Sequence, residues 1–238
     1  AAEYYKNFDW SKPWFKSVEW YGNKCQVSTS PDNLDAINAS KMYFGIYNLA
    51  NDAFKNVAGK NEAGEETATY AQKQLGNALT ALGNYNKEYK SDGTGGYAFP
   101  ASATLNSQDI AGGWFHKKSY LYEMWLDGQY MGPALLAQII NYNNKTNNVS
   151  TDDWKTIIKQ LDIVWKQCWN ETDRLLYHAF EANGGTGTSN SHADLWEGLS
   201  STNFHSASYW GRACGWYFLA LVDILAEMDK ANLSSNST

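Results

Sequence analysis

Apolar residues recur at a spacing of about 3.6 positions in five stretches of this chain, which is the period of a helix that buries one face. The second stretch is rich in Ala, Gln and Leu and is followed by Gly83-Asn84, a pair that favours a helix end. The last stretch is strongly apolar on one side. The pattern therefore predicts helices over residues 32–51, 65–82, 125–141, 151–168 and 213–228.

Long polar segments separate these helices. Residues 84–116 are rich in Gly, Ser, Asn and Asp and include Pro100, and residues 182–201 are rich in Gly, Ser and Asn. Such compositions do not favour a long regular element, and no alternation of apolar and polar residues is long enough to predict a strand. We expect an all-α chain whose loops gather at one end of a helix bundle and build a site there.

Size and charge narrow the class of protein. With 238 residues and 43% hydrophobic content, the chain suits one globular domain. The net charge is -6 and no dense Lys/Arg cluster occurs, which argues against nucleic acid as a partner. No apolar run reaches the roughly 18 residues of a membrane span, and residues 1–5 lack the features of a signal peptide. We therefore expect no membrane partner.

The sequence also lacks the usual motifs for metals and cofactors. Cys25, Cys168 and Cys214 are far apart and form no CxxC pair, which is typical of small buried side chains rather than of a disulfide framework or a zinc site. GxSxG, P-loop, HExxH and dinucleotide-binding motifs do not occur. We expect no metal and no cofactor.

Aromatic residues are abundant. The chain has 11 Trp, 16 Tyr and 9 Phe, many of them next to Gly, Asn, His or Asp. Such rings offer apolar faces to a pyranose and polar edges to its hydroxyl groups, which favours a carbohydrate site. The alternative is that the rings fill a large helical core.

The first cluster of chemical groups surrounds the start of the third predicted helix. Residues 112–117 (GGWFHK) lead into residues 124–131 (MWLDGQYM). If Trp125 begins the helix, Asp127 shares a face with Tyr130 and Met131. Asp127 is then either the acid of a site or a first-turn residue that complements the helix dipole, with Trp125 and Met131 packed in the core.

A second cluster lies at the start of the last predicted helix, in residues 210–217 (WGRACGWY). Arg212 and Trp216 are four residues apart, so the guanidinium and the indole can line one wall. Arg can hold a carboxylate through paired hydrogen bonds while Trp stacks on a ring, which suits a carboxylated sugar. The alternative is an ordinary cation–π contact at a helix end.

Several titratable residues have no evident partner in the sequence. Asp35 is a candidate carboxylate on the first predicted helix, although a lone Asp in a first turn is more often a capping or dipole residue. His178 follows a helix at the point where a loop returns, and a structural role is the simpler interpretation. His192 and His205 lie in Ser/Asn-rich sequence that suggests no partner.

Together, residues 112–117, 124–131 and 210–217 resemble glycoside hydrolase family 105, the unsaturated rhamnogalacturonyl hydrolases, in order and spacing. Residues 34–38 (LDAIN) are similar to the family's earlier aspartate-bearing helix. The resemblance implies an (α/α)6 barrel. Such a barrel has more helices than the five predicted here, so we expect residues 1–238 to be one partial barrel domain, without the first helix and the last several. Exposed barrel faces would then favour self-association.

The resemblance also implies roles for individual residues. Asp127 corresponds to the general acid/base and Asp35 to the second essential carboxylate, and the remaining matches line the sugar subsite. These are His116, Lys117, Trp125, Met131, His178, Trp210, Arg212 and Trp216. The implied partner is an unsaturated uronide oligosaccharide, and the implied setting is the periplasm or cytoplasm of a polysaccharide-degrading bacterium.

The implied reaction is hydration of the C4–C5 double bond of a terminal unsaturated uronic acid from pectin-derived oligosaccharides. Asp127 would protonate C4 and help to deliver water to C5. Such an acid must keep its proton near neutral pH, so burial and the charge of Asp35 would have to raise its pKa against the helix dipole. The alternatives are a hydrolase for unsaturated glucuronyl ends of ulvan or glycosaminoglycans, or a catalytically silent carbohydrate-binding barrel. The two retained aspartates argue against the silent protein.

Overall fold

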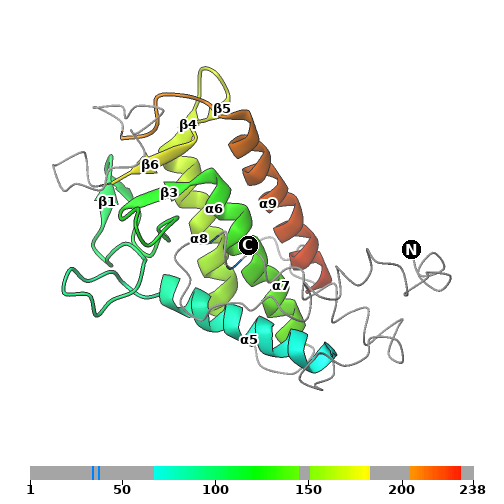
Figure 1. Ribbon diagram of the computed structural model, residues 1–238. Coiled ribbons are helices and arrows are strands. Elements are labelled where there is room, and N and C mark those ends of the chain that lie inside the picture. Colours follow the sequence, from blue (N-terminus) through cyan, green and yellow to red (C-terminus); the bar gives the residue numbers. More distant parts are fainter. Residues whose placement is uncertain (1–33, 35–36, 38–66, 145–150, 183–203, 232–238) are drawn as a thin grey trace, which may run out of the picture. The chain divides into compact units, whose positions relative to one another are not determined.

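The computed structural model describes residues 34, 37, 67–144, 151–182 and 204–231 (Figure 1). The chain divides into two compact units, residues 1–29 with 39–80, and residues 30–38 with 81–238. The second unit contains all the described candidate site residues. Asp35 and His192 lie outside the described residues.

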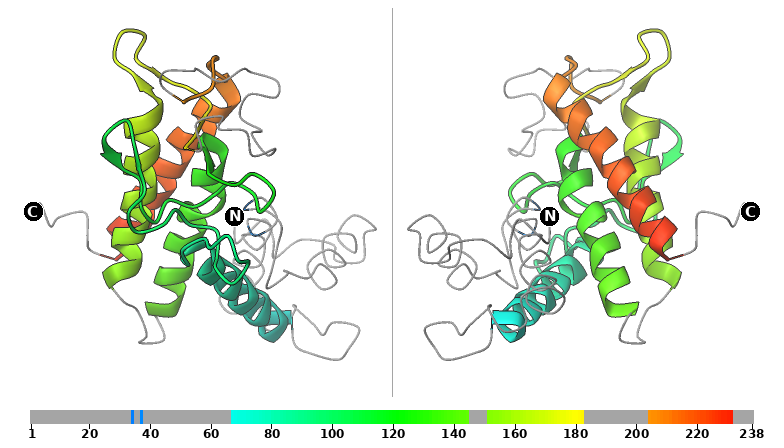
Figure 2. Two further views of the ribbon diagram at one scale, coloured as in Figure 1. Left: turned by 90° about the vertical axis from the view of Figure 1, so that its left-hand side faces the viewer. Right: turned by 90° about the vertical axis from the view of Figure 1, so that its right-hand side faces the viewer.

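Helices make up most of the described structure. Helix α8 spans Thr151–Cys168, as predicted, and α9 spans Gly211–Lys230, slightly longer than predicted. Helix α9 packs against α6 (Leu126–Met131) and α7 (Pro133–Asn144), and α7 also packs against α8. Figures 1 and 2 show α7, α8 and α9 side by side. Buried residues follow the helical period along α8, among them Trp154, Ile157, Leu161 and Val164.

The single helix predicted over residues 125–141 is wrong, because the structure has two helices there. Helix α6 ends at Met131, Gly132 caps it, and α7 begins at Pro133. Proline has no N–H to continue a helix, but its fixed φ suits the first position of a new one. The chain therefore starts a separate helix immediately after the short α6, which carries Asp127.

The other predicted helix ends differ less. Helix α5 spans Thr67–Tyr85 and so continues through Gly83-Asn84, where an end was predicted. Tyr85 is fully buried, and its ring lies 6.4 Å from that of Trp114. This packing outweighs the local preference for a helix end. Of the predicted helix at 32–51, only Leu34 and Ile37 are described, and both are helical and buried.

The long loops contain short strands that the sequence did not predict. Strand β1 (Thr104–Leu105) pairs with β2 (Gln108–Asp109), and β4 (Trp169–Asn170) pairs with β5 (Leu175–Leu176), both antiparallel. Strand β3 (Glu123–Trp125) pairs antiparallel with β6 (Ala179–Glu181). Strands of two or three residues are too short to show an alternating pattern. The prediction of an all-α chain is therefore correct only for the main elements.

The β3–β6 ladder has two different faces. Met124 and Phe180 are opposite each other in the register and both are fully buried. The ring of Phe180 stacks at 6.1 Å on Phe99, which is in turn 4.9 Å from Phe115. Trp125 lies on the other face, because successive strand residues point to opposite sides. An aromatic core thus supports the ladder from one side.

Cysteines and several aromatic residues are buried in the described part of the chain. Cys168 and Cys214 are free and buried, as expected, and Cys25 lies outside the described residues. Tyr85, Trp114 and Tyr217 are core residues, so part of the aromatic content does fill the core. Among the described helices, none has the length and apolar composition needed to cross a bilayer.

Candidate active site

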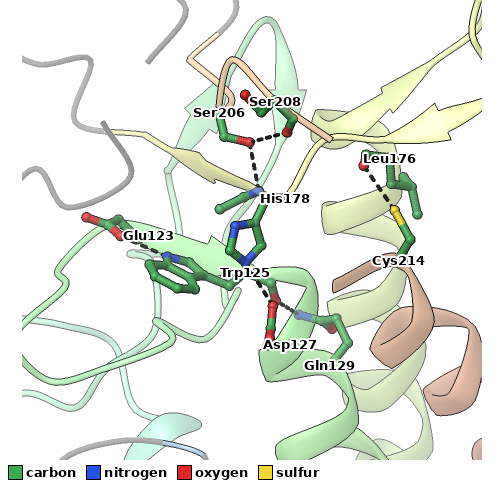
Figure 3. A network of polar contacts seen from close by, with 10 residues as sticks. Glu123, Trp125, Asp127, Gln129, Leu176, His178, Ser206, Ser208 and Cys214 are labelled. Atoms are coloured by element: carbon green, nitrogen blue, oxygen red, sulfur yellow. Dashed lines mark hydrogen bonds and ion pairs between the residues drawn. The ribbon is translucent and has the colours of Figure 1, made fainter. Parts of the chain in front are cut away.

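Two short elements place Asp127 beside His178. Trp125 ends β3 with extended backbone (φ -113°, ψ 149°), and α6 begins at the next residue, which puts Asp127 in the first turn. The Leu126 N–H donates to the carbonyl oxygen of His178 at 3.0 Å. The His178 Nε2 and Asp127 Oδ2 atoms are 2.9 Å apart (Figure 3). His178 is 4% exposed and Asp127 17%, so the pair is largely shielded but reachable.

A serine-containing segment fixes the backbone around His178. The His178 N–H donates to the Ser208 carbonyl at 3.4 Å, and the Ala179 N–H donates to Ser206 Oγ at 3.3 Å. The Ser206 hydroxyl in turn donates to the Ser208 carbonyl at 3.2 Å (Figure 3). These bonds fix the backbone from which the imidazole projects.

Aromatic rings gather around Trp125. His116 stacks on its indole at 4.7 Å with an interplanar angle of 10°, and Tyr120 stacks at 5.6 Å. The ring of His178 meets Trp125 edge-on at 4.9 Å. Lys117 Nζ lies 5.9 Å from the indole centroid. The predicted subsite residues His116, Lys117, Trp125 and His178 are therefore brought together with Asp127.

The surroundings of Asp127 favour its anion. Burial raises the pKa of Asp127, but the hydrogen bond from His178 and the charge of its imidazole lower it by more, so the pKa lies below the ordinary 3.8. The expected rise of this pKa is therefore wrong for the described surroundings, because the expectation took no account of the imidazole. Asp35, the other group expected to raise it, lies outside the described residues.

His116 is held neutral. Burial lowers its pKa to about 3, and the nearby Asp127 charge only partly opposes this effect. A neutral imidazole can stack on the Trp125 indole without the cost of burying a charge.

The second predicted cluster lies at the start of α9. The Arg212 guanidinium lies 5.5 Å from the ring of Trp210, whereas Trp216 lies 4.9 Å from Tyr130 of α6. A cation–π contact at a helix end, the alternative given for this cluster, therefore forms between Arg212 and Trp210. Arg212 and Trp216 both belong to α9 and are four residues apart, as the shared wall requires. Met131 is buried, with 8% of its surface exposed. Through Trp216 and Tyr130, α9 contacts the helix that carries Asp127.

The sequence of residues 51–238 is similar to that of a known enzyme family. A family model described as Glycosyl Hydrolase Family 88 matches residues 51–238. The chain belongs to glycosyl hydrolase family 88. The match covers most of the chain and includes the Asp127, His178 and Arg212 segments.

A solved structure has a fold similar to that of this family 88 chain. It is a glycoside hydrolase from family 105 of C. acetobutylicum ATCC 824, with 21% sequence identity and a TM-score of 0.54. The similarity covers 85% of this chain and 45% of that one. The family 88 chain thus spans less than half of that structure. The resemblance inferred from the three sequence blocks is confirmed by these two findings.

The structure of the family 88 chain also shows contacts that the sequence did not suggest. The ring of His205, for which no partner was expected, stacks on Tyr177 at 3.7 Å, and Tyr209 stacks on Tyr177 at 4.5 Å. Asn170 donates to both tyrosine hydroxyls.

Glu123, which was not a candidate, is fully buried beside Trp125. Its position two residues before Trp125 was the one available signal, since such residues share a strand face.

No group of three or more potential metal ligands occurs among the residues that the structure describes in this family 88 chain. The chemistry that the described site offers is that of a carboxylate and an imidazole next to stacked rings.

Proposed function

We propose that this chain carries the site of an unsaturated uronyl hydrolase, which removes a terminal 4,5-unsaturated uronic acid from rhamnogalacturonan-type oligosaccharides. The observation that supports it best is the 2.9 Å contact between Asp127 and His178 beside the Trp125 rings. An acid–imidazole pair can transfer protons, and aromatic faces suit a sugar ring. We further propose that the complete fold is an (α/α)6 barrel.

Each group in the cluster has a proposed task. Asp127 donates a proton to C4 and accepts one from the water that attacks C5, so its carboxyl group is regenerated. Asp35 acts as the second carboxylate. Trp125 and His116 form an aromatic wall, and Lys117 supplies positive charge near the sugar carboxylate. Arg212 binds the carboxylated sugar from the start of α9, and Met131, Trp210 and Trp216 complete the subsite.

The reaction consumes one water. Protonation at C4 and addition of hydroxide at C5 convert the double bond into a hemiketal. The ring bond between C5 and its oxygen then breaks, which leaves a C5 ketone and a hemiacetal at C1. Collapse of this hemiacetal to an aldehyde expels the aglycone as an alcohol. The route differs from that of ordinary glycosidases, where two carboxylates react at the anomeric carbon.

Asp127 must be protonated to donate a proton to C4, but its lowered pKa favours the ionised carboxylate when no substrate is bound. The substrate itself carries a carboxylate, and a second negative charge close to Asp127 raises the pKa of its carboxyl group. Exclusion of water by the bound sugar acts in the same direction. Binding of the uronide therefore favours the protonated acid, and His178 holds the carboxyl group toward the site in both states.

The test uses three oligosaccharides that end in unsaturated galacturonic acid, unsaturated glucuronic acid or saturated galacturonic acid. The ultraviolet absorbance of the conjugated alkene is followed over time. We expect loss of absorbance with the first and no release of sugar from the saturated analogue. Loss with the glucuronyl substrate alone would favour the ulvan or glycosaminoglycan alternative. Binding of both unsaturated sugars without reaction would indicate a silent carbohydrate-binding protein.

A further inference from the structure

Glu123 lies two residues before Trp125 in β3, so the two side chains share one face of the strand. Its side chain is 0% exposed. The indole N–H of Trp125 donates to Glu123 Oε2 at 2.8 Å (Figure 3). The bond joins a fully buried carboxyl group to the ring that contacts both His116 and His178.

The position of Glu123 in the ladder is unusual for an acidic residue. Its register partner across β6 is Glu181, which is 1% exposed. Two acidic residues directly opposite each other on a buried ladder destabilise a sheet unless their oxygens are well bonded. An apolar residue at position 123 would avoid this cost but would leave the indole N–H without this acceptor. The bond to the indole therefore requires a hydrogen-bond acceptor at position 123, which an apolar packing residue cannot supply.

That contribution is the orientation of the Trp125 ring. Stacking on His116 restricts the tilt of the indole, but a stacked ring can still slide in its own plane. A hydrogen bond at the ring edge prevents this movement, because it requires the N–H to point at one atom. The position of the indole in turn limits where the edge of His178, 4.9 Å away, can lie.

We propose that Glu123 is a positioning residue, which fixes the indole of Trp125 and through it the aromatic wall of the sugar subsite. The sugar part of this proposal rests on the proposed function, but the placement of the ring does not. Glu123 acts through Trp125 and takes no part in proton transfer.

The test compares Glu123→Met, which removes the acceptor at similar length, with Glu123→Gln, whose amide oxygen can still accept the N–H bond. Glu181→Gln is the matched control, since it changes the opposite acidic residue of the same ladder. The protein is labelled with ¹⁵N-tryptophan, and the Trp125 indole signal is assigned by its loss in Trp125→Phe. The indole shift and its hydrogen exchange are measured without ligand.

We expect Glu123→Met to shift the Trp125 indole signal and speed its exchange, while Glu123→Gln and Glu181→Gln retain slow exchange. In kinetics with an unsaturated oligosaccharide, Glu123→Met should raise KM about tenfold, because sugar binding must then order an indole that the hydrogen bond had already fixed. Its kcat should change less, and Glu123→Gln should restore most of the loss.

An unchanged indole signal in folded Glu123→Met would overturn the proposal, as would an equal change in Glu181→Gln. If Glu123→Met fails to fold, fast hydrogen exchange of the Trp125 indole N–H in folded Glu123→Gln, which keeps an acceptor, decides against the contact. If the wild-type protein hydrolyses no unsaturated uronide, the proposed function fails, and the indole signal still decides whether Glu123 positions Trp125.

Discussion

His178 Nε2 lies 2.9 Å from Asp127 Oδ2, although 51 residues separate them in the sequence. The β3–β6 ladder brings them together, because it pairs Trp125, two residues before Asp127, with Ala179, which directly follows His178. The contact makes the protonation of the acid depend on the imidazole. It also explains why burial alone does not set the pKa of Asp127.

Replacement of His178 by Asn should raise the pKa of the Asp127 carboxyl group. The hydrogen bond and the charge of His178 lower this pKa, so their removal leaves the opposing effect of burial to dominate. The measurement is a ¹³C NMR titration of the aspartate carboxyl signals, with Asp127→Asn to assign the resonance. An unchanged or lower pKa in the His178 variant would show that the pair does not control this acid.

Gln160 of α8 should be important for stability through the loop that carries His116. Its side-chain oxygen accepts the Trp114 N–H at 2.8 Å, and its NH₂ group donates to the Gly112 carbonyl at 2.8 Å. Gln160→Leu keeps the volume but leaves these buried groups unsatisfied, which should lower the free energy of unfolding by about 2 to 5 kcal/mol. Urea denaturation gives the value.

Gln167→Leu is the matched control for this prediction. Gln167 is also a buried residue of α8, but one of its two partners is the exposed Asn106, which can bond to water instead. Replacement of Gln167 should therefore lower the free energy of unfolding by less than replacement of Gln160. If Gln167→Leu lowers the free energy of unfolding as much as Gln160→Leu or more, the bonds of Gln160 to the Gly112–Trp114 backbone do not stabilise the fold more than those of Gln167.

Two glycines should respond to alanine in opposite directions. At Gly132, between α6 and α7, a Cβ atom would lie 2.9 Å from Trp114 Cζ3, and Trp114 is buried. Gly132→Ala should therefore destabilise the fold by about 1 to 3 kcal/mol. At Gly215, inside α9, no atom lies within 4 Å of the added Cβ, so alanine should stabilise by about 0.5 to 1 kcal/mol. Thermal unfolding of both variants measures the contrast, and equal effects would contradict it.

The neutral His116 predicts acid sensitivity. Its pKa is about 3 in the fold and 6.5 ordinarily, so between these pH values the unfolded chain binds a proton that the folded protein does not. Above pH 6.5 the protonation of His116 does not lower the free energy of unfolding. As the pH falls from 6.5 toward 3, this free energy declines by about 1.4 kcal/mol per pH unit.

His116→Asn removes this titration. The free energy of unfolding of the variant should decline less steeply than that of the wild type between about pH 6 and pH 4. The measurement is a series of urea denaturations across this range. A constant loss of stability in the variant does not affect the comparison, because the slope is what is measured. Equal slopes would show that His116 is not kept neutral by burial.

The sequence predicted those features that depend on local pattern. Helix α8 matches its predicted range because its apolar period is regular over its whole length. The break before Pro133 could have been predicted, since proline rarely continues a helix. The grouping of His116, Trp125 and Asp127 was also accessible, because these residues are close in the chain.

The contact between Asp127 and His178 could not be derived from local pattern. It depends on the register of two three-residue strands, and such short strands leave no signal in the sequence. The same holds for the His205–Tyr177 stack, which joins segments on either side of residues 183–203. The pKa of Asp127 was wrongly expected to rise for this reason, because its direction depends on a partner distant in sequence.

Asp127→Asn tests whether Asp127 is the acid of the reaction, because Asn keeps the shape of the side chain but cannot donate or accept the catalytic proton. The rate of loss of alkene absorbance is measured with an unsaturated galacturonyl oligosaccharide for wild type and variant at equal folded concentration. We expect steady loss with the wild type and a rate at least about a hundredfold lower in the variant. An equal rate in the variant would contradict the role of Asp127.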